Sequence, residues 1–266
     1  MTIVLRDRLL TAAVGVPLLI LLVCWSPSWL FATAILLLTG IGLWEYFSLT
    51  RPLSSLPSAV GVGWGLAVAV TMTASSLSLS VTVLLLGLFV VFALALRNHQ
   101  PERGLVDVSL SLLGVVYVGF LLPHLIWLGE VPNGRWWVFF LLLAVMLGDS
   151  AAYAVGRIWG SRKLLPHISP GKTVEGSLGA YLGNCGAAIG AWLWLLPDQT
   201  LVELLCIALG LGSVAQVGDL CESAIKRACG AKDSGHIFPG HGGVLDRVDS
   251  LLFPSAMLYY YITLSA

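Results

Sequence analysis

The sequence predicts an all-α integral membrane protein with about nine transmembrane helices. Hydrophobic residues make up 58% of its 266 positions and charged residues only 11%, and the mean hydropathy is +0.91. A soluble globular chain carries about 25% charged residues, so this composition argues against a water-soluble domain. The chain has 14 basic and 14 acidic residues. The resulting net charge of zero excludes binding to nucleic acid through overall charge.

Long apolar runs define the predicted helices, because about 20 apolar residues are needed to cross the hydrocarbon core of a bilayer. In chain order the runs are 9–25, 29–47, 59–74, 81–96, 106–128, 136–155, 178–196, 201–217 and 248–264. The third and fourth runs have 16 residues each, which leaves their ends open. The five cysteines form no Cys-x-x-Cys pair, and three of them lie in apolar runs. They are therefore interpreted as small core residues.

The basic residues predict the orientation in the membrane. Of the 14 Lys and Arg residues, 13 fall in segments on one side of the alternating chain and only Arg135 falls on the other. Cytoplasmic loops are enriched in Lys and Arg, so the N-terminus is expected in the cytoplasm and the C-terminus outside. Arg6 and Arg8 before the first run resemble a signal peptide. An Ala-x-Ala site at residues 32–34 lies inside the second run, however, which favours a retained first helix.

The polar residues divide the chain into two parts. Residues 1–134 have short connections and are interpreted as a scaffold of transmembrane helices, with contacts in a homodimer left open. Residues 135–266 are predicted to form the catalytic region, with cytoplasmic loops at 156–176 and 218–249. The acidic residues of the first part are Asp7, Glu45, Glu102, Asp107 and Glu130. Because most other acids lie in or beside the two long loops, chemistry is expected in the second part.

Two aspartates lie at the ends of apolar runs, where charge is costly. A charged residue in a transmembrane helix costs about 2.5–3.5 kcal/mol on insertion scales, so Asp149 and Asp219 are candidates for a polar site. No helix breaker follows Asp219, and the spacing of the next residues places Glu222, Ser223 and Lys226 on the same helical face. The alternative interpretation of this face is a solvated helix end with a Glu222–Lys226 ion pair.

The loop that follows is rich in glycine and charge. Gly240, Gly242 and Gly243 allow backbone amides to approach an anion, and Asp246 and Asp249 lie one helical turn apart. Carboxylates among cationic and glycine-rich groups suit Mg²⁺ bound with a polyphosphate. Two histidines of this loop, His236 and His241, could bind zinc. The absence of a nearby thiol and the larger number of acids favour magnesium.

The loop at 156–176 contains Gly171-Lys172-Thr173, which resembles the end of a P-loop. The first glycine of that motif is replaced by Pro166, and no strand is expected to precede it, so the motif is not a P-loop. Lys172 beside a glycine turn at a helix start can still bind a phosphate. The following helix carries two Gly-x-x-x-Gly pairs, which predict close helix packing. They are formed by Gly179 with Gly183 and by Gly186 with Gly190.

These motifs resemble the phosphatidate cytidylyltransferases, also called CDP-diacylglycerol synthases. The longest one reads Ser223-x-Ile225-Lys226-Arg227-x-x-x-x-Lys232-Asp233-x-Gly235-x-x-Phe238-Pro239-Gly240-His241-Gly242-Gly243-x-x-Asp246-Arg247-x-Asp249. Two shorter matches are Gly148-Asp149-Ser150 and Ser169-Pro170-x-Lys172-Thr173-x-Glu175-Gly176. The resemblance covers the chain from about residue 136 to its end. Before that point it is limited to hydropathy.

The resemblance implies an activity and its partners. Such an enzyme transfers CMP from CTP to phosphatidate at the cytoplasmic face, forming CDP-diacylglycerol and pyrophosphate with the help of Mg²⁺, as two divalent cations or a mixed pair. The location that this implies is the inner, or plasma, membrane of a bacterium.

The resemblance also implies roles for individual residues. The expected metal ligands are Asp219 and Asp246, with Asp149 and Glu222 as further candidates. The expected catalytic residues are Lys172, Lys226, Arg227 and Asp249. The expected substrate-binding residues are Ser169, Lys172, Glu175, Lys232, His241, Gly242, Gly243 and Arg247.

Two other functions fit parts of the pattern. CDP-alcohol phosphotransferases also use paired metals on lipids, but they require an Asp-Gly dipeptide that does not occur here. An ion-coupled transporter could use Asp149 and Asp219 as intramembrane relays. Transport favours acids near the middle of broken helices, whereas these two lie at helix ends on one side. The sequence therefore favours an enzyme.

Overall fold

The computed structural model describes residues 15, 17–97, 100–235, 237 and 242–265, and helices dominate this part of the chain. A two-stranded hairpin is the only sheet among these residues. The all-α class predicted from hydropathy is therefore confirmed. By chain contacts the protein divides into two compact units, and each is described by itself.

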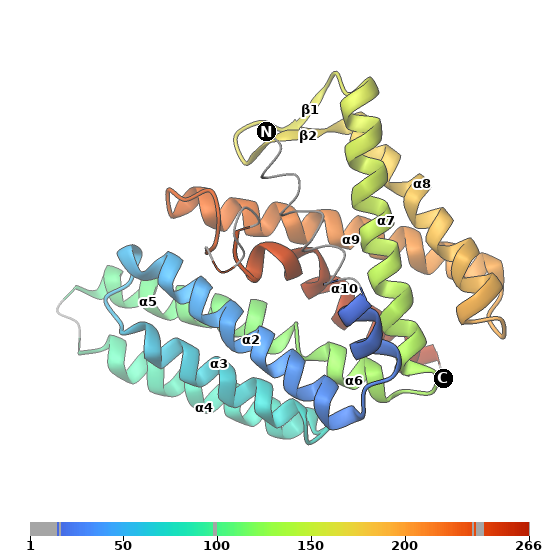
Figure 1. Cartoon of the computed structure of the whole chain (residues 1–266). Coiled ribbons are helices and arrows are strands. Elements are labelled where there is room, and N and C mark those ends of the chain that lie inside the picture. The colour runs from blue at the N-terminus through green and yellow to red at the C-terminus, as the bar shows by residue number, and fades with distance from the viewer. Residues whose placement is uncertain (1–14, 16, 98–99, 236, 238–241, 266) are drawn as a thin grey trace. The chain divides into compact units, whose positions relative to one another are not determined.

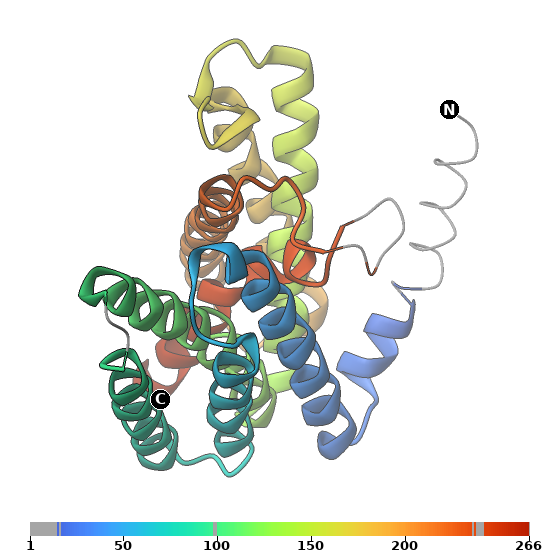
Figure 2. The ribbon, with the colours of Figure 1, turned by 90° about the vertical axis from the view of Figure 1, so that its left-hand side faces the viewer.

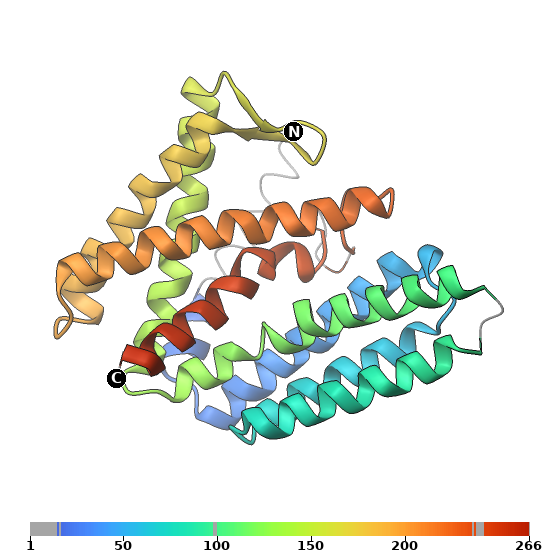
Figure 3. The same cartoon turned by 180° about the vertical axis from the view of Figure 1, so that it is seen from behind.

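The first unit comprises the described residues up to Trp127 together with residues 228–248. It begins with a helix described at residues 15 and 17–24. Its other elements are α2 (Ser28–Thr50), the 3₁₀ turn η1 (Arg51–Leu53), α3 (Ser58–Met72), α4 (Leu77–Ala95), α5 (Pro101–Gly114), the π-helical turn η2 (Val115–Phe120) and the start of α6 (His124–Glu130). Figures 1 and 3 show α2, α3, α4 and α5 side by side as a bundle.

Short turns connect the helices of this bundle. The Pro and Ser residues between the apolar runs mark the positions of these turns. Pro27 and Pro57 stand at the N-caps of α2 and α3, and the Ser76 hydroxyl accepts a hydrogen bond from Leu79 N at the start of α4. The helices approach most closely where glycines replace side chains. A Cβ on Gly119 of η2 would lie 2.9 Å from the backbone of Gly65 in α3.

The second unit comprises residues 128–227 and 249–266. Its elements are the end of α6, α7 (Gly134–Trp159), β1 (Lys163–Leu165), β2 (Ser169–Thr173), α8 (Val174–Gly190), the π-helical turn η3 (Ala191–Leu195), most of α9 (Leu201–Ala228) and most of α10 (Leu245–Ser265). Figure 2 shows the hairpin of β1 and β2 between the carboxyl end of α7 and the start of α8.

One of the two predicted glycine pairs packs helices together, and the other does not. A Cβ on Gly179 would lie 2.5 Å from Val155, and one on Gly183 would lie 2.1 Å from the Leu147 carbonyl oxygen, so α7 and α8 touch along this face. A Cβ on Gly186 would meet nothing within 4 Å, and on Gly190 it would meet only Trp194, 3.8 Å away. The packing prediction is thus confirmed for the first pair alone.

This difference predicts the effect of one methyl group at two neighbouring positions. Gly183→Ala should lower the free energy of unfolding by about 1–3 kcal/mol, because the helices must separate to admit the new Cβ. Gly186→Ala serves as the control, and it should be neutral or stabilising by about 0.5–1 kcal/mol through helix propensity. Thermal unfolding of the detergent-purified proteins measures both. Equal shifts in melting temperature would contradict the packing assignment.

Five helical segments are long and apolar enough to cross a membrane among the described residues. They are Ser28–Leu53, Leu77–Ala95, Pro101–Glu130, Gly134–Trp159 and Leu201–Ala228, and Ser58–Met72 is a shorter apolar helix. An integral membrane protein is thereby supported. Nine crossings and their orientation stay a prediction, and most of the first predicted run, residues 9–25, lies outside the described residues.

Candidate active site

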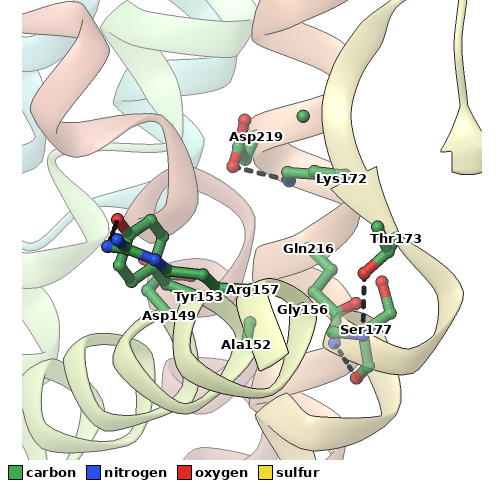
Figure 4. Close-up of a pocket in the computed structure, with 12 residues that line it drawn as sticks. Asp149, Ala152, Tyr153, Gly156, Arg157, Lys172, Thr173, Ser177, Gln216 and Asp219 are labelled. Atoms are coloured by element: carbon green, nitrogen blue, oxygen red, sulfur yellow. Dashed lines mark hydrogen bonds and ion pairs between the residues drawn. The ribbon is translucent and has the colours of Figure 1, made fainter. Parts of the chain in front are cut away.

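A pocket of about 630 Å³ opens in the second unit between α7, β2, the start of α8 and α9. Its volume lies in the range of about 300–1,000 Å³ that is usual for small-molecule sites. The residues that line it are Asp149, Ala152, Tyr153, Gly156, Arg157, Gly171, Lys172, Thr173, Gly176, Ser177, Gln216 and Asp219. Figure 4 shows them.

Three of the predicted site residues meet in this pocket. Lys172 Nζ on β2 lies 2.6 Å from Asp219 Oδ2 on α9, and both side chains keep about a quarter of their surface exposed, 26% and 29%. Asp149 on α7 is close enough to interact electrostatically with both groups. Figure 4 shows the Lys172–Asp219 ion pair across the pocket from Asp149. The two aspartates that were singled out by insertion cost therefore line one cavity.

A face of α7 adds two residues that sequence analysis did not assign to the site. Arg157 Nη1 donates a hydrogen bond of 3.0 Å to the Tyr153 hydroxyl, and both residues line the pocket. Tyr153 and Arg157 follow Asp149 by four and eight positions, so all three lie on one helical face. The same spacing argument that grouped residues around Asp219 could have found them from Asp149.

Gln216 on α9 is a further pocket residue that the sequence motifs did not indicate. It lies three positions before Asp219 on the same helical face. Its Nε2 donates a hydrogen bond of 3.3 Å to the Ser177 carbonyl at the start of α8. This bond ties the two helices together at the pocket wall.

The hairpin that carries Lys172 corrects one expectation. Sequence analysis expected no strand before the Gly171-Lys172-Thr173 turn, but β2 contains all three residues and leads directly into α8. Lys163 and Leu165 of β1 pair with Thr173 and Ser169, so a short antiparallel ladder satisfies the backbone of this loop. The Thr173 hydroxyl then caps α8 by accepting from Gly176 N. Lys172 thus lies on a strand that leads directly into the start of α8, as the expected helix start requires, and only the expected absence of a strand was wrong.

Glu175 holds the hairpin in place. Its carboxylate accepts hydrogen bonds from Ser161 Oγ at 2.7 Å, from Ser161 N at 3.1 Å and from Arg162 N at 3.2 Å. The Ser161 hydroxyl is the main reason why the pKa of Glu175 is lowered to about 2. Sequence analysis expected Glu175 to bind substrate. In the structure it anchors the start of the hairpin beside Lys172, and Ser169 pairs within the same ladder.

The end of α9 is helical as predicted, and its charged residues bond to their neighbours. Glu222 forms an ion pair with Lys226, and the Ser223 hydroxyl lies 3.4 Å from Asp219 Oδ1. Arg227 Nε donates to the Ile168 carbonyl between the two strands at 3.2 Å. These contacts agree with the helical face that was deduced from spacing. They do not test the catalytic roles of Lys226 and Arg227, which stay predictions.

Asp249 is buried, with 7% of its surface exposed. It lies in α10, where the second unit resumes. Its Oδ1 accepts from Ser250 N at 2.7 Å and from the Ser250 hydroxyl at 3.2 Å. The carboxylate also interacts electrostatically with Asp219 and Lys226. A third aspartate is thus in electrostatic reach of the pocket.

The remaining predicted residues belong to the first unit. Asp246 Oδ2 accepts hydrogen bonds from Ser234 N at 2.9 Å and from Gly243 N at 2.8 Å. Gly242 has a φ of +78°, and a Cβ there would lie 2.4 Å from Asp246 Oδ2, so only glycine fits. Lys232 and Arg247 are exposed. His241 lies outside the described residues.

The donor groups of the pocket fit a hard divalent cation that also binds phosphate. Within the described part of the chain, no three His, Cys, Asp or Glu side chains are grouped closely enough to hold a metal by themselves. Mg²⁺ characteristically takes one or two protein carboxylates and completes its shell with phosphate oxygens and water. Asp149 and Asp219, which both line the pocket, meet that requirement in number and type.

Comparisons with known proteins extend the resemblance beyond the C-terminal motifs. The sequence profile of the cytidylyltransferase family matches residues 6–265. A Synechocystis sp. protein named phosphatidate cytidylyltransferase is 34% identical over 97% of this chain and 96% of its own length. A Bacillus subtilis protein of the same name is 41% identical over 59% of each chain. An uncharacterized Escherichia coli protein is 40% identical over 61% of this chain and 56% of its own.

Proposed function

This chain belongs to the cytidylyltransferase family, and from that membership we propose that it transfers CMP from CTP to phosphatidate, with CDP-diacylglycerol and pyrophosphate as products. The relatives named phosphatidate cytidylyltransferase support this substrate pair. The observation that carries the proposal is the pocket in which Lys172, Asp219 and Asp149 meet. Cations and carboxylates around one pocket are the groups that a metal-bound triphosphate requires.

The reaction is a displacement at the α-phosphorus of CTP. An oxygen of the phosphatidate phosphate attacks this phosphorus, a new P–O bond forms, and the bond to the bridging oxygen of pyrophosphate breaks. The attacking phosphate is already anionic at neutral pH, so no protein nucleophile is required. The chain's contribution is to position the two phosphates and to stabilise the charge that develops on pyrophosphate.

The cationic side chains of the pocket perform the second task. Lys172 is paired with Asp219, and its ammonium group can turn to a phosphate oxygen when CTP adds negative charge. Arg157 presents a planar donor group that suits a second phosphate. Further positive charge would come from Lys226 and Arg227 at the end of α9, from Lys232 after it and from Arg247 at the start of α10. Preorganised cations of this kind stabilise charge without having to reorient during the reaction.

Asp219 and Asp246 would hold the Mg²⁺ ions, with Asp149 and Glu222 as further ligands. When bound, the cations would supply charge stabilisation for the attacking and leaving oxygens. That Asp219 and Asp246 serve one metal pair is part of the proposal. The predicted topology supports it, because one span ends at Asp219 and the next begins at Asp246, which places both acids near one membrane surface.

The proposed active-site side is the cytoplasmic face of a bacterial inner membrane, because 13 of the 14 basic residues fall on one predicted side. Single cysteines introduced by Ala266→Cys and Lys232→Cys into a cysteine-free variant test this orientation. A membrane-impermeant thiol reagent should label the first and not the second in right-side-out vesicles. Labelling of both should follow once the vesicles are opened. The opposite pattern in intact vesicles would overturn the orientation.

The decisive experiment is CTP-dependent formation of CDP-lipid by the purified protein. Protein in detergent with dioleoyl phosphatidate, CTP and Mg²⁺ should release pyrophosphate and CDP-lipid in equal amounts, and EDTA should stop both. Omission of phosphatidate is the control, since CTP hydrolysis alone would also release pyrophosphate. Absence of CDP-lipid from folded protein under these conditions would refute the proposal and favour the ion-coupled transporter.

A further inference from the structure

Glu45 is a buried carboxylate in the part of the chain that sequence analysis treated as scaffold. It lies in α2 within a predicted membrane span, and only 1% of its surface is exposed. An acid in such a place is costly unless it has partners. The hydrogen-bond partners of its carboxylate indicate its structural role.

The carboxylate of Glu45 binds the beginning of α10 about 200 residues later in the chain. Oε1 accepts from Val244 N at 3.0 Å, and Oε2 accepts from Leu245 N at 2.7 Å. The first amides of a helix have no partner within the helix, and the helix dipole favours a negative charge at this end. Glu45 therefore acts as an N-terminal cap for α10 that is supplied by a different helix.

The glycine-containing loop before α10 is shaped to admit this side chain. A Cβ on Gly243 or on Gly235 would lie 2.4 Å from Glu45 Oε1. Both values are far below van der Waals contact, so these backbones approach the carboxylate only because they carry no side chain. Two glycines of the longest sequence motif are thus explained by a residue outside that motif.

Ser234 connects Glu45 to Asp246. Its hydroxyl donates to Glu45 Oε2 at 3.3 Å and accepts from Asp246 N at 3.3 Å. Its backbone N donates to Asp246 Oδ2 at 2.9 Å. The same carboxylate oxygen accepts from Gly243 N, which lies beside Glu45. The groups that orient Asp246 are therefore the groups that Glu45 holds.

We propose that Glu45 is a positioning residue for nucleotidyl transfer, which fixes the start of α10 and the adjoining loop so that Asp246 is presented in its working orientation. This inference rests on the proposed function, because that function makes Asp246 a metal ligand. Glu45 itself touches no substrate in this scheme. It acts through Ser234, Gly243 and the first amides of α10.

Glu45→Gln tests the inference, because glutamine has the size of glutamate. Its side-chain NH₂ group replaces one acceptor oxygen and would face a backbone N–H group, which is also a donor. Asp107→Asn is the matched control. Asp107 is also buried in a predicted span, with 1% exposed. It accepts from Ser54 Oγ at 2.8 Å and from Ser55 N at 2.7 Å. It therefore makes the same kind of bonds to a loop that holds no predicted site residue.

The first measurement is hydrogen–deuterium exchange of the peptide covering residues 242–250, in protein without metal or substrate. Glu45→Gln should speed the exchange of the Val244 and Leu245 amides by about tenfold or more, because these amides lose the charged acceptor of their hydrogen bonds. Asp107→Asn should leave this peptide unchanged. This readout does not depend on catalysis.

The second measurement is turnover per folded molecule as a function of Mg²⁺ concentration. Glu45→Gln should lower kcat by about 10–100-fold and raise the Mg²⁺ concentration for half-maximal activity, as loss of a group that orients a metal ligand does. Ser234→Ala, which leaves the two backbone bonds of Glu45 in place, should change both values in the same direction by a smaller factor. If Glu45→Gln does not fold, Ser234→Ala takes its place as the test.

The outcomes separate this inference from the proposed function. Faster exchange together with slower turnover and weaker Mg²⁺ activation supports it. Unchanged exchange, or faster exchange with wild-type turnover and Mg²⁺ dependence, overturns it while the wild-type protein still makes CDP-lipid. Failure of the wild-type protein to make CDP-lipid would instead refute the proposed function.

Discussion

Asp219→Asn and Asp246→Asn are each expected to reduce kcat/KM for CDP-lipid formation by about 10³-fold or more. A bound metal contributes several kcal/mol of charge stabilisation, and each 1.4 kcal/mol corresponds to a tenfold change in rate. Asn keeps the size of the side chain but removes the charge that holds the cation. Purified variants that elute as folded protein should bind less Mg²⁺ and release pyrophosphate at the background rate.

The double variant distinguishes a shared site from two separate roles. If both aspartates serve one metal pair, the double variant should be no slower than either single one, because residues that act as a unit are strongly non-additive. Multiplied losses would indicate independent contributions. A folded Asp246→Asn protein with activity near that of the wild type would contradict the two-metal mechanism. The ligands would then have to be sought among other acids such as Glu222 and Asp249.

Lys172→Gln is expected to lower kcat/KM for CTP by about 10²-fold, the effect of losing one preorganised charge at a reacting phosphate. Lys172 is the pocket cation that lies 2.6 Å from Asp219, so its loss also leaves the aspartates without their nearest counter-charge. Lys172→Arg should recover part of the activity, because it restores the charge in a different geometry. Initial rates at varied CTP concentration measure these effects.

Lys163→Gln is the matched control for Lys172→Gln. Lys163 lies on β1 of the same hairpin, is exposed and does not line the pocket, so its substitution should change kcat/KM by less than about twofold, as surface substitutions away from a site do. Similar losses from both substitutions would show that the hairpin responds to its overall charge. Lys172 would then have no specific role at the phosphates.

The architecture was predictable because hydropathy is a local property. Within the described residues the long apolar runs lie mostly in helix, since the requirement to bury about 20 apolar residues in a bilayer acts on every segment separately. A turn at residues 121–123 interrupts the run 106–128. The insertion cost of Asp149 and Asp219 is equally local, and it pointed to the cavity that both line. The C-terminal motifs indicate the family by themselves, because the order and spacing of their residues are specific.

Contacts between distant segments could not be predicted in this way. The pairing of Lys172 with Asp219 depends on a hairpin that a motif argument had excluded. Glu175, a predicted substrate-binding residue, also anchors that hairpin through Ser161. In each case the residue type was compatible with several roles, and only the position of its hydrogen-bond partners selects one.

Glu45 shows the limit most clearly. By sequence alone it was one acid in an apolar run, separated by about 200 residues from the loop that it holds. Sequence by itself determined the helices, the acidic pocket residues and the family, because each leaves a pattern along the chain. Tertiary structure decided which carboxylates serve the pocket and which support the backbone. A buried charge takes its role from the donors that folding brings to it, and those donors are distributed over the whole chain.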